Sequence, residues 1–142
     1  MEIELKWIDG VHFEAADENG HRVPMDGPPE AGGQNLGTRP MQLILMGLAG
    51  CTAYDVIEIL RKGRQQVEGL EVCLRGSRAL DVPAVFEAID IHFILRGKGL
   101  NPQRVDRAAS LSAEKYCSAS IMLARAGVQI SHSYEIFDAT EA

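Results

Sequence analysis

Cysteines are the residues of this 142-residue sequence best suited to chemistry, and there are three of them. A cysteine thiolate is a nucleophile that can be oxidised reversibly. An odd cysteine count does not suggest a structural disulfide framework, and no CxxC or Cys/His spacing predicts a metal site. Cys51 and Cys117 are each bordered by small or hydroxyl residues. The residues alone leave two readings open, a reactive thiol pair and inert buried cysteines.

Cys73 is interpreted differently. It lies in a strand-like stretch, on the same face as Glu71 and Arg75 and opposite the apolar Val72 and Leu74. Successive side chains of a strand point to opposite faces of the sheet. We therefore expect Cys73 on the solvent side, as a thiol with no part in the chemistry.

The segment that must position Cys51 is a long helix predicted from Pro40 to Lys62. Proline suits the first helical turn, and Gly63 stands where a glycine ends a helix. Residues 41–54 carry no charge, so this half should be buried on every side. Because a small monomer offers few such places, we expect an intimate homodimer.

Two glycines of this helix lie close to the thiol. Gly47 precedes Cys51 by one turn, and Gly50 precedes Tyr54 by one turn. A helical glycine leaves a notch through which a backbone, a side chain or a substrate can approach. Close helix crossing explains the same glycines, and both explanations remain open.

The bulk composition excludes several classes. A net charge of -6 with pI near 5.2 argues against a nucleic-acid partner. The uncharged run of the helix is shorter than the ~20 residues that a membrane span needs, so no membrane partner is expected. The acidic, alternating N-terminus has no secretory signal pattern, which favours a cytoplasmic protein.

The rest of the chain predicts a single α+β domain over residues 1–142. Alternating residues predict three antiparallel strands before Asp26, with the long helix as their cover. After an irregular loop at 27–38 and the helix, the expected elements are strands at 70–77 and 85–96, a helix at 101–115 with a break at 116–118, a helical piece at 119–126, a strand at 128–137 and a frayed tail from Asp138.

Two cysteine segments resemble a known family. Pro40 opens a helix that reaches LAGCTAYDV at residues 48–56, and EKYCSASIML follows at residues 114–123. In this order they resemble the osmotically inducible protein C and organic hydroperoxide resistance proteins (OsmC/Ohr), and the sequence as a whole is most similar to the YhfA-like branch of that family. The resemblance covers nearly the whole chain.

The resemblance implies an intertwined homodimer in which antiparallel sheets pack on long central helices. It also implies thiol-dependent reduction of organic hydroperoxides, with Cys51 as the peroxidatic and Cys117 as the resolving cysteine. An external dithiol would reduce the resulting disulfide, and no metal, flavin or haem cofactor would be required. The predicted substrate pocket is lined by four residues of the helix: Met41, Gly47, Gly50 and Tyr54.

Two positions differ from the peroxidases of the family. Those carry a glutamate directly after the helix-opening proline, where this sequence has Met41, and that glutamate orients an arginine near the thiolate. Cys51 lies mid-helix, where apolar burial raises a thiol pKa and the helix dipole gives no help. A cation must compensate, and Arg39 is our predicted partner of Cys51 in the dimer.

The missing glutamate supports an alternative, a redox-sensing or apolar-ligand-binding protein of this fold with weak catalysis. A purely structural dimer with inert thiols is a third hypothesis.

Overall fold

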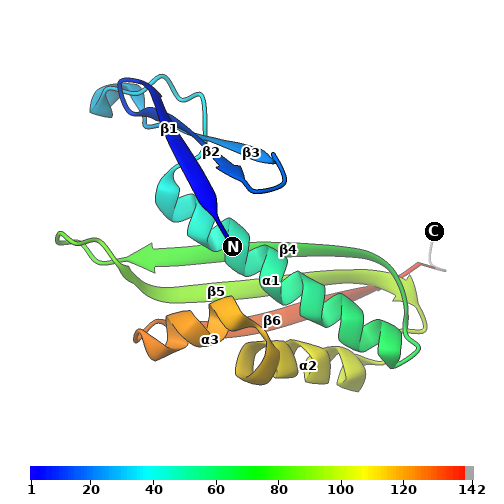
Figure 1. Ribbon diagram of the computed structural model, residues 1–142. Coiled ribbons are helices and arrows are strands. Elements are labelled where there is room, and N and C mark those ends of the chain that lie inside the picture. The colour runs from blue at the N-terminus through cyan, green and yellow to red at the C-terminus, as the bar shows by residue number, and fades with distance from the viewer. Residues whose placement is uncertain (140–142) are drawn as a thin grey trace. The chain divides into compact units, whose positions relative to one another are not determined.

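The computed structural model describes residues 1–139 and divides into two compact units, residues 1–44 and residues from 45 onward, which we describe separately (Figure 1). The strands are β1 (Ile3–Asp9), β2 (His12–Asp17), β3 (Arg22–Met25), β4 (Gln66–Arg78), β5 (Phe86–Lys98) and β6 (Gln129–Asp138). The α-helices are α1 (Pro40–Lys62), α2 (Pro102–Leu111) and α3 (Ser118–Arg125), with a 3-10 turn at Pro29–Ala31 and a π-helical segment at Ser112–Tyr116.

The first unit is built on the antiparallel sheet β1-β2-β3, as the sequence predicts. Its two turns contain Gly10 and Gly20, both with positive φ, which glycine adopts without strain. The strand β1 leaves its large apolar side chains Ile3, Leu5 and Trp7 more than half exposed. This sheet therefore presents apolar surface that the single chain does not bury.

Asp26 organises the irregular loop after β3. The residue is 2% exposed, and its carboxylate accepts hydrogen bonds from the backbone N–H groups of Gly27, Gln34 and Leu36 at 2.7–3.1 Å. Burial acts to raise the pKa of Asp26, but these three hydrogen bonds stabilise the charged form and lower the pKa below its usual value. A buried carboxylate thus holds the glycine-rich segment in one conformation.

The start of α1 is fixed by a capping interaction. The Oε1 atom of Gln42 accepts hydrogen bonds from the backbone N–H of Arg39 at 2.9 Å and from the Thr38 hydroxyl at 3.0 Å. A glutamine at the third helical position that reaches back to the preceding backbone N–H is half of a capping box. Pro40 occupies the first helical position, as predicted.

The second unit contains a sheet in the order β4-β5-β6. The strands β4 and β5 are antiparallel, as expected, but β6 runs parallel to β5, so the sheet is mixed and not wholly antiparallel. The reason is the connection: α2, the π-helical segment and α3 form a crossover that returns the chain in the direction of β5.

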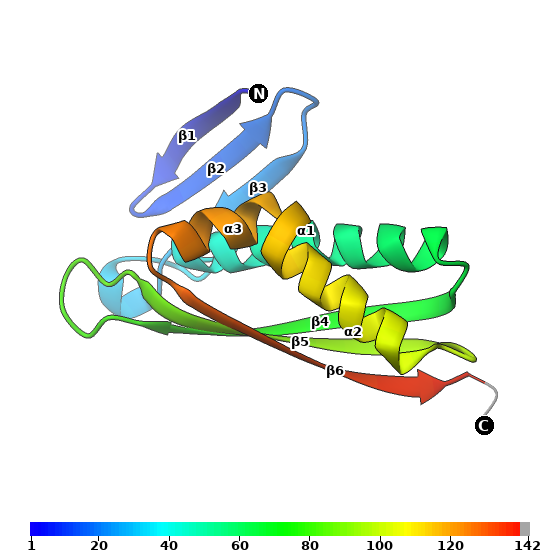
Figure 2. The same ribbon diagram turned by 90° about the horizontal axis from the view of Figure 1, so that it is seen from below.

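Helices cover one face of this sheet, as the two views of Figures 1 and 2 show for α2, α3 and the part of α1 that belongs to this unit. The central strand β5 supplies the core side chains Ile89, Ile91, Phe93 and Leu95, each at most 2% exposed. From α1, a stripe at every fourth residue is buried: Leu48, Thr52, Val56 and Leu60. The core is thus a helix layer on a sheet, and the α+β prediction is confirmed.

The helix α1 differs from its prediction in two respects. Its buried stripe belongs to the unit of the second sheet, whereas we expected it to cover the N-terminal strands. Burial on every side is not found in the single chain, where Met46 is 55% and Tyr54 71% exposed. The helix is long and apolar enough to cross a membrane by length and composition alone, but such a stripe buried on a sheet is typical of a core helix.

The second helical region, residues 102–125, comprises α2, the π-helical segment and α3. It is broken where the sequence indicated a break, although α2 ends earlier than expected. Asn101 caps α2 by accepting the Gln103 N–H at 2.9 Å, and the buried residues Val105, Ala108 and Ala109 form a stripe of small side chains. The helix then widens into the π-helical segment at Ser112.

The C-terminal segment was expected to fray from Asp138. Asp138 instead belongs to β6, and the Ala139 N–H donates to the Gly97 carbonyl, so fraying is not found at these two residues. Residues 140–142 lie outside the described part.

Candidate functional site

The two predicted thiols meet in the second unit. Cys51 comes from the middle of α1 and is half-buried, while Cys117 lies between the π-helical segment and α3 and is fully buried. A hydrogen bond between the two side chains raises the pKa of Cys117. Neither of these two cysteines forms a disulfide in this structure. The sequence identified both residues, but their contact depends on how α1 packs beside the second helical region.

Cys117 is held in its protonated form. Burial is the largest cause, followed by the hydrogen bond to Cys51 and by electrostatic interactions with Cys51 and Asp55, and together they raise the pKa of Cys117 to about 11. The backbone N–H of Ser120 opposes this by donating to the Cys117 Sγ at 3.4 Å, in the manner of a helix N-cap. At neutral pH Cys117 is therefore a protonated thiol.

The raised pKa predicts a loss of stability in alkaline solution. The folded protein holds the Cys117 proton more tightly than the unfolded chain does. The contribution of protonated Cys117 to the free energy of unfolding is therefore complete below the ordinary thiol pKa of about 8.5, and it is lost as pH rises through about 11. We expect about 3 kcal/mol of unfolding free energy to be lost from this source. Urea unfolding of the reduced protein between pH 8 and 11, compared with Cys117→Ser, measures it; equal pH slopes for the two proteins would contradict it.

A buried group of hydroxyls lies beside the thiols. The Ser112 hydroxyl contacts the Thr52 hydroxyl at 2.8 Å and donates to Asp55 Oδ2 at 3.2 Å. Thr52 and Ser112 are at most 2% exposed. No sequence motif singles out Ser112. A signal that could have identified its role is its spacing from Cys117, because Ser112 opens the segment that leads to this cysteine.

Arg39 belongs to the first unit, where its Nη1 atom donates to three oxygens of the loop before α1: the Asn35 side chain at 2.9 Å and the carbonyls of Gly37 at 3.2 Å and Asp26 at 3.3 Å. These contacts hold the guanidinium in a fixed position within its unit. Its predicted pairing with Cys51 would occur between two subunits and stays a prediction.

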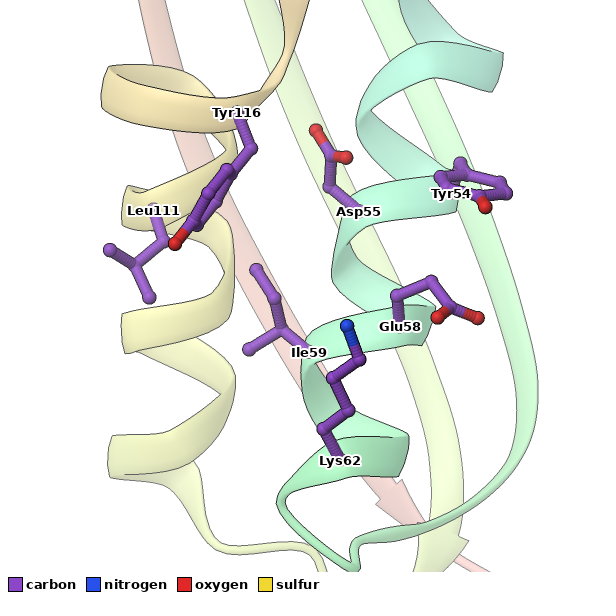
Figure 3. A pocket seen from close by; sticks show the side chains of 7 residues that line it. All are labelled: Tyr54, Asp55, Glu58, Ile59, Lys62, Leu111 and Tyr116. Carbon is purple, nitrogen blue, oxygen red and sulfur yellow. The ribbon is translucent and has the colours of Figure 1, made fainter.

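A pocket of about 410 Å³ lies between α1 and the second helical region (Figure 3). Its lining combines apolar and charged side chains: Tyr54, Asp55, Glu58, Ile59, Lys62, Leu111 and Tyr116. Figure 3 shows the Asp55 carboxylate pointing into the space between α1 and the segment that carries Tyr116. Neither sulfur lines this pocket, but two of its lining residues are close to the thiols in sequence: Asp55 follows Cys51 by one turn, and Tyr116 directly precedes Cys117.

Of the residues predicted to form the substrate pocket, Tyr54 lines this one. Gly47 and Gly50 lie on the same helix outside its lining, and Met41 belongs to the first unit. A methyl group added at Gly47 or Gly50 would meet no side chain or neighbouring element within 4 Å. The notch one turn before Cys51 is therefore open in the single chain.

Cys73 is exposed on β4, as predicted, with Glu71 and Arg75 on the same face. In residues 1–139, no three His, Cys, Asp or Glu side chains gather in a way that could hold a metal ion.

Comparison with known proteins gives a consistent result. Residues 32–133 match the family of OsmC-like proteins. The Escherichia coli K12 protein YhfA is 43% identical over 139 residues, covering 96% of this chain and 98% of YhfA. A crystal structure of a hypothetical protein from Aquifex aeolicus is 28% identical with a TM-score of 0.83, covering 96% of each chain.

A more distant structure shares the fold. The Legionella pneumophila protein, described as an organic hydroperoxide resistance protein OsmC and predicted redox protein, is 20% identical with a TM-score of 0.71, covering 95% of this chain and 97% of that one. The family match spans most of the sequence and includes both cysteine segments. The chain therefore belongs to the family of OsmC-like proteins.

Proposed function

We propose that this protein reduces organic hydroperoxides with the Cys51 and Cys117 pair and works as one domain over residues 1–142. The main support for the proposal is the contact between the two thiols, of which Cys117 is fully buried and has a raised pKa. Because Cys117 is fully buried and its pKa is raised, the half-buried Cys51 is the nucleophile of the pair. Relatives described as organic hydroperoxide resistance proteins support the class of substrate.

The reaction balances without a cofactor. The Cys51 thiolate attacks the terminal peroxide oxygen, an S–O bond forms, the O–O bond breaks, and the alkoxide takes a proton to leave as an alcohol. The Cys51 sulfenic acid then meets the Cys117 thiol, an S–S bond forms, and the hydroxyl leaves with the thiol proton as water. An external dithiol returns both cysteines to the reduced state by thiol–disulfide exchange.

The dimer is part of the proposal because the chain leaves apolar surface without cover. The exposed large side chains include Leu5 and Trp7 on β1 and Met46 and Tyr54 on α1. Apolar surface of this extent marks an interaction site. A second subunit would bury it and would bring an Arg39 to Cys51, which supplies the cation that a mid-helix thiolate needs.

Steady-state turnover tests the proposal. Purified protein with cumene hydroperoxide and a dithiol should consume many equivalents of peroxide per chain, and hydrogen peroxide should react more slowly. Consumption that stops near one equivalent per chain would favour the alternative, a redox sensor or apolar-ligand-binding protein. That alternative is favoured by Met41, which stands where the peroxidases carry a glutamate.

The third hypothesis, a structural dimer with inert thiols, needs a separate test. Native protein is treated with a thiol-alkylating reagent, and the modified residues are identified by peptide mass. Prompt alkylation of half-buried Cys51 would exclude inertness, whereas labelling confined to exposed Cys73 would exclude the peroxidase.

Gly47→Ala tests whether the open notch is the approach to Cys51. The added methyl has free space in the chain, and alanine favours the helix over glycine by about 1 kcal/mol, so urea unfolding should need more denaturant. Peroxide consumption should nevertheless fall, by about tenfold if the lost approach costs roughly 1.4 kcal/mol in the transition state. Unchanged turnover in Gly47→Ala would mean that peroxide reaches Cys51 by another route.

A further inference from the structure

Ser112 connects the segments that carry the two cysteines. Its hydroxyl contacts Thr52, the residue after Cys51, at 2.8 Å, and donates to Asp55, one turn after Cys51, at 3.2 Å. Its backbone carbonyl accepts the N–H of Cys117 at 2.8 Å. One serine is therefore bonded to the Cys51 helix through its side chain and to the Cys117 backbone through its main chain.

The local backbone makes this connection possible. Residues 112–116 form a π-helical segment, in which the N–H of Cys117 reaches back five residues to Ser112. Such widened turns are rare and are frequently found at functional sites. After this widened turn, Cys117 takes an extended backbone conformation, from which its sulfur caps α3 by accepting the Ser120 N–H.

We propose that Ser112 is a positioning residue that holds Cys117 in the place and orientation from which it can close a disulfide with Cys51. The inference rests on the proposed function and deepens it. Ser112 does not itself react, but it keeps the two thiols in the geometry in which they work.

The physical reason is the narrow geometry of a disulfide. Two sulfurs bond only when the Cα atoms lie about 4.4–6.8 Å apart with suitably directed side chains. Cys117 precedes a helix of only eight residues and follows an irregular turn, so its own backbone gives little rigidity. The Ser112 hydroxyl is fully buried and supplies a tie to the long, regular helix α1. Fixing two reacting groups in this way raises their effective concentration.

The test is the equilibrium of the Cys51–Cys117 disulfide in glutathione redox buffers, measured by alkylation and mass after quenching. This readout uses no peroxide, so it remains informative if the peroxidase proposal fails. Ser112→Ala should lower the equilibrium constant for forming the Cys51–Cys117 disulfide in glutathione buffers about tenfold. Ser112→Thr, which keeps the hydroxyl, should restore most of the loss. Because a purely structural role would act on overall stability, urea unfolding is measured on the same variants.

Ser120→Ala is the matched control. Ser120 is as buried as Thr52 and lies beside Cys117, but its bond to the Cys117 sulfur comes from the backbone N–H, which alanine keeps. If Ser112→Ala fails to fold, Thr52→Val removes the shorter of the two contacts between the Ser112 hydroxyl and α1 with little change of shape, and should weaken the disulfide in the same direction. The proposal would be overturned if the equilibrium constant of the Cys51–Cys117 disulfide in Ser112→Ala, or in Thr52→Val where Ser112→Ala does not fold, stays within twofold of that of the unaltered protein. An equal shift in Ser120→Ala would overturn it as well.

Discussion

Replacing Cys51 with serine is expected to reduce peroxide consumption to the rate measured without protein. A serine hydroxyl is close in size to the thiol but does not ionise near neutral pH, and it does not form a sulfenic acid. The loss should be on the order of a thousandfold or more, as for other removed nucleophiles. Peroxide disappearance in the presence of a dithiol, followed over many equivalents, is the measurement.

Cys73→Ser is the control for that experiment. Cys73 is also a free cysteine, but it lies exposed on the sheet, away from the helix layer. The control variant should keep full turnover, which separates the loss of one particular thiol from a general effect of removing cysteine. Activity that survives in Cys51→Ser, or that disappears in Cys73→Ser, would show that the nucleophile has been assigned wrongly.

The second large effect is expected for Cys117→Ser. This variant should still react with about one equivalent of hydroperoxide per chain, because Cys51 remains, but no disulfide can form. Turnover should then fall at least about tenfold, since an external thiol must replace a neighbour held in place. The Cys51 sulfenic acid should accumulate and be trapped by dimedone, with an adduct visible in the intact mass.

The variant is expected to fold, because serine is a strong N-cap residue and its hydroxyl can accept the Ser120 N–H in place of the sulfur. The unaltered protein serves as the comparison and should give a disulfide and little dimedone adduct. Equal trapping in the two proteins would show that Cys117 does not resolve the sulfenic acid.

Several features of the structure were predictable because they depend on local patterns. The boundaries of α1 follow from Pro40 and Gly63, and the exposed position of Cys73 follows from strand alternation. The family resemblance is confirmed for the same reason, since it depends on cysteine segments that can be read directly in the sequence. The parallel pairing of β6 was missed because strand direction depends on a crossover that hydrophobic periodicity does not reveal.

For the candidate site, the sequence by itself determined only the candidates: the sulfurs of Cys51 and Cys117, one in a long apolar helix and one before a short helix. Only the tertiary structure decided that they touch, that burial and the Cys51 contact keep Cys117 protonated, and that Ser112 joins their supporting segments. The physical reason is that a thiol's reactivity depends on its neighbours in space. Residues 66 positions apart become neighbours only when their helices pack on a common sheet.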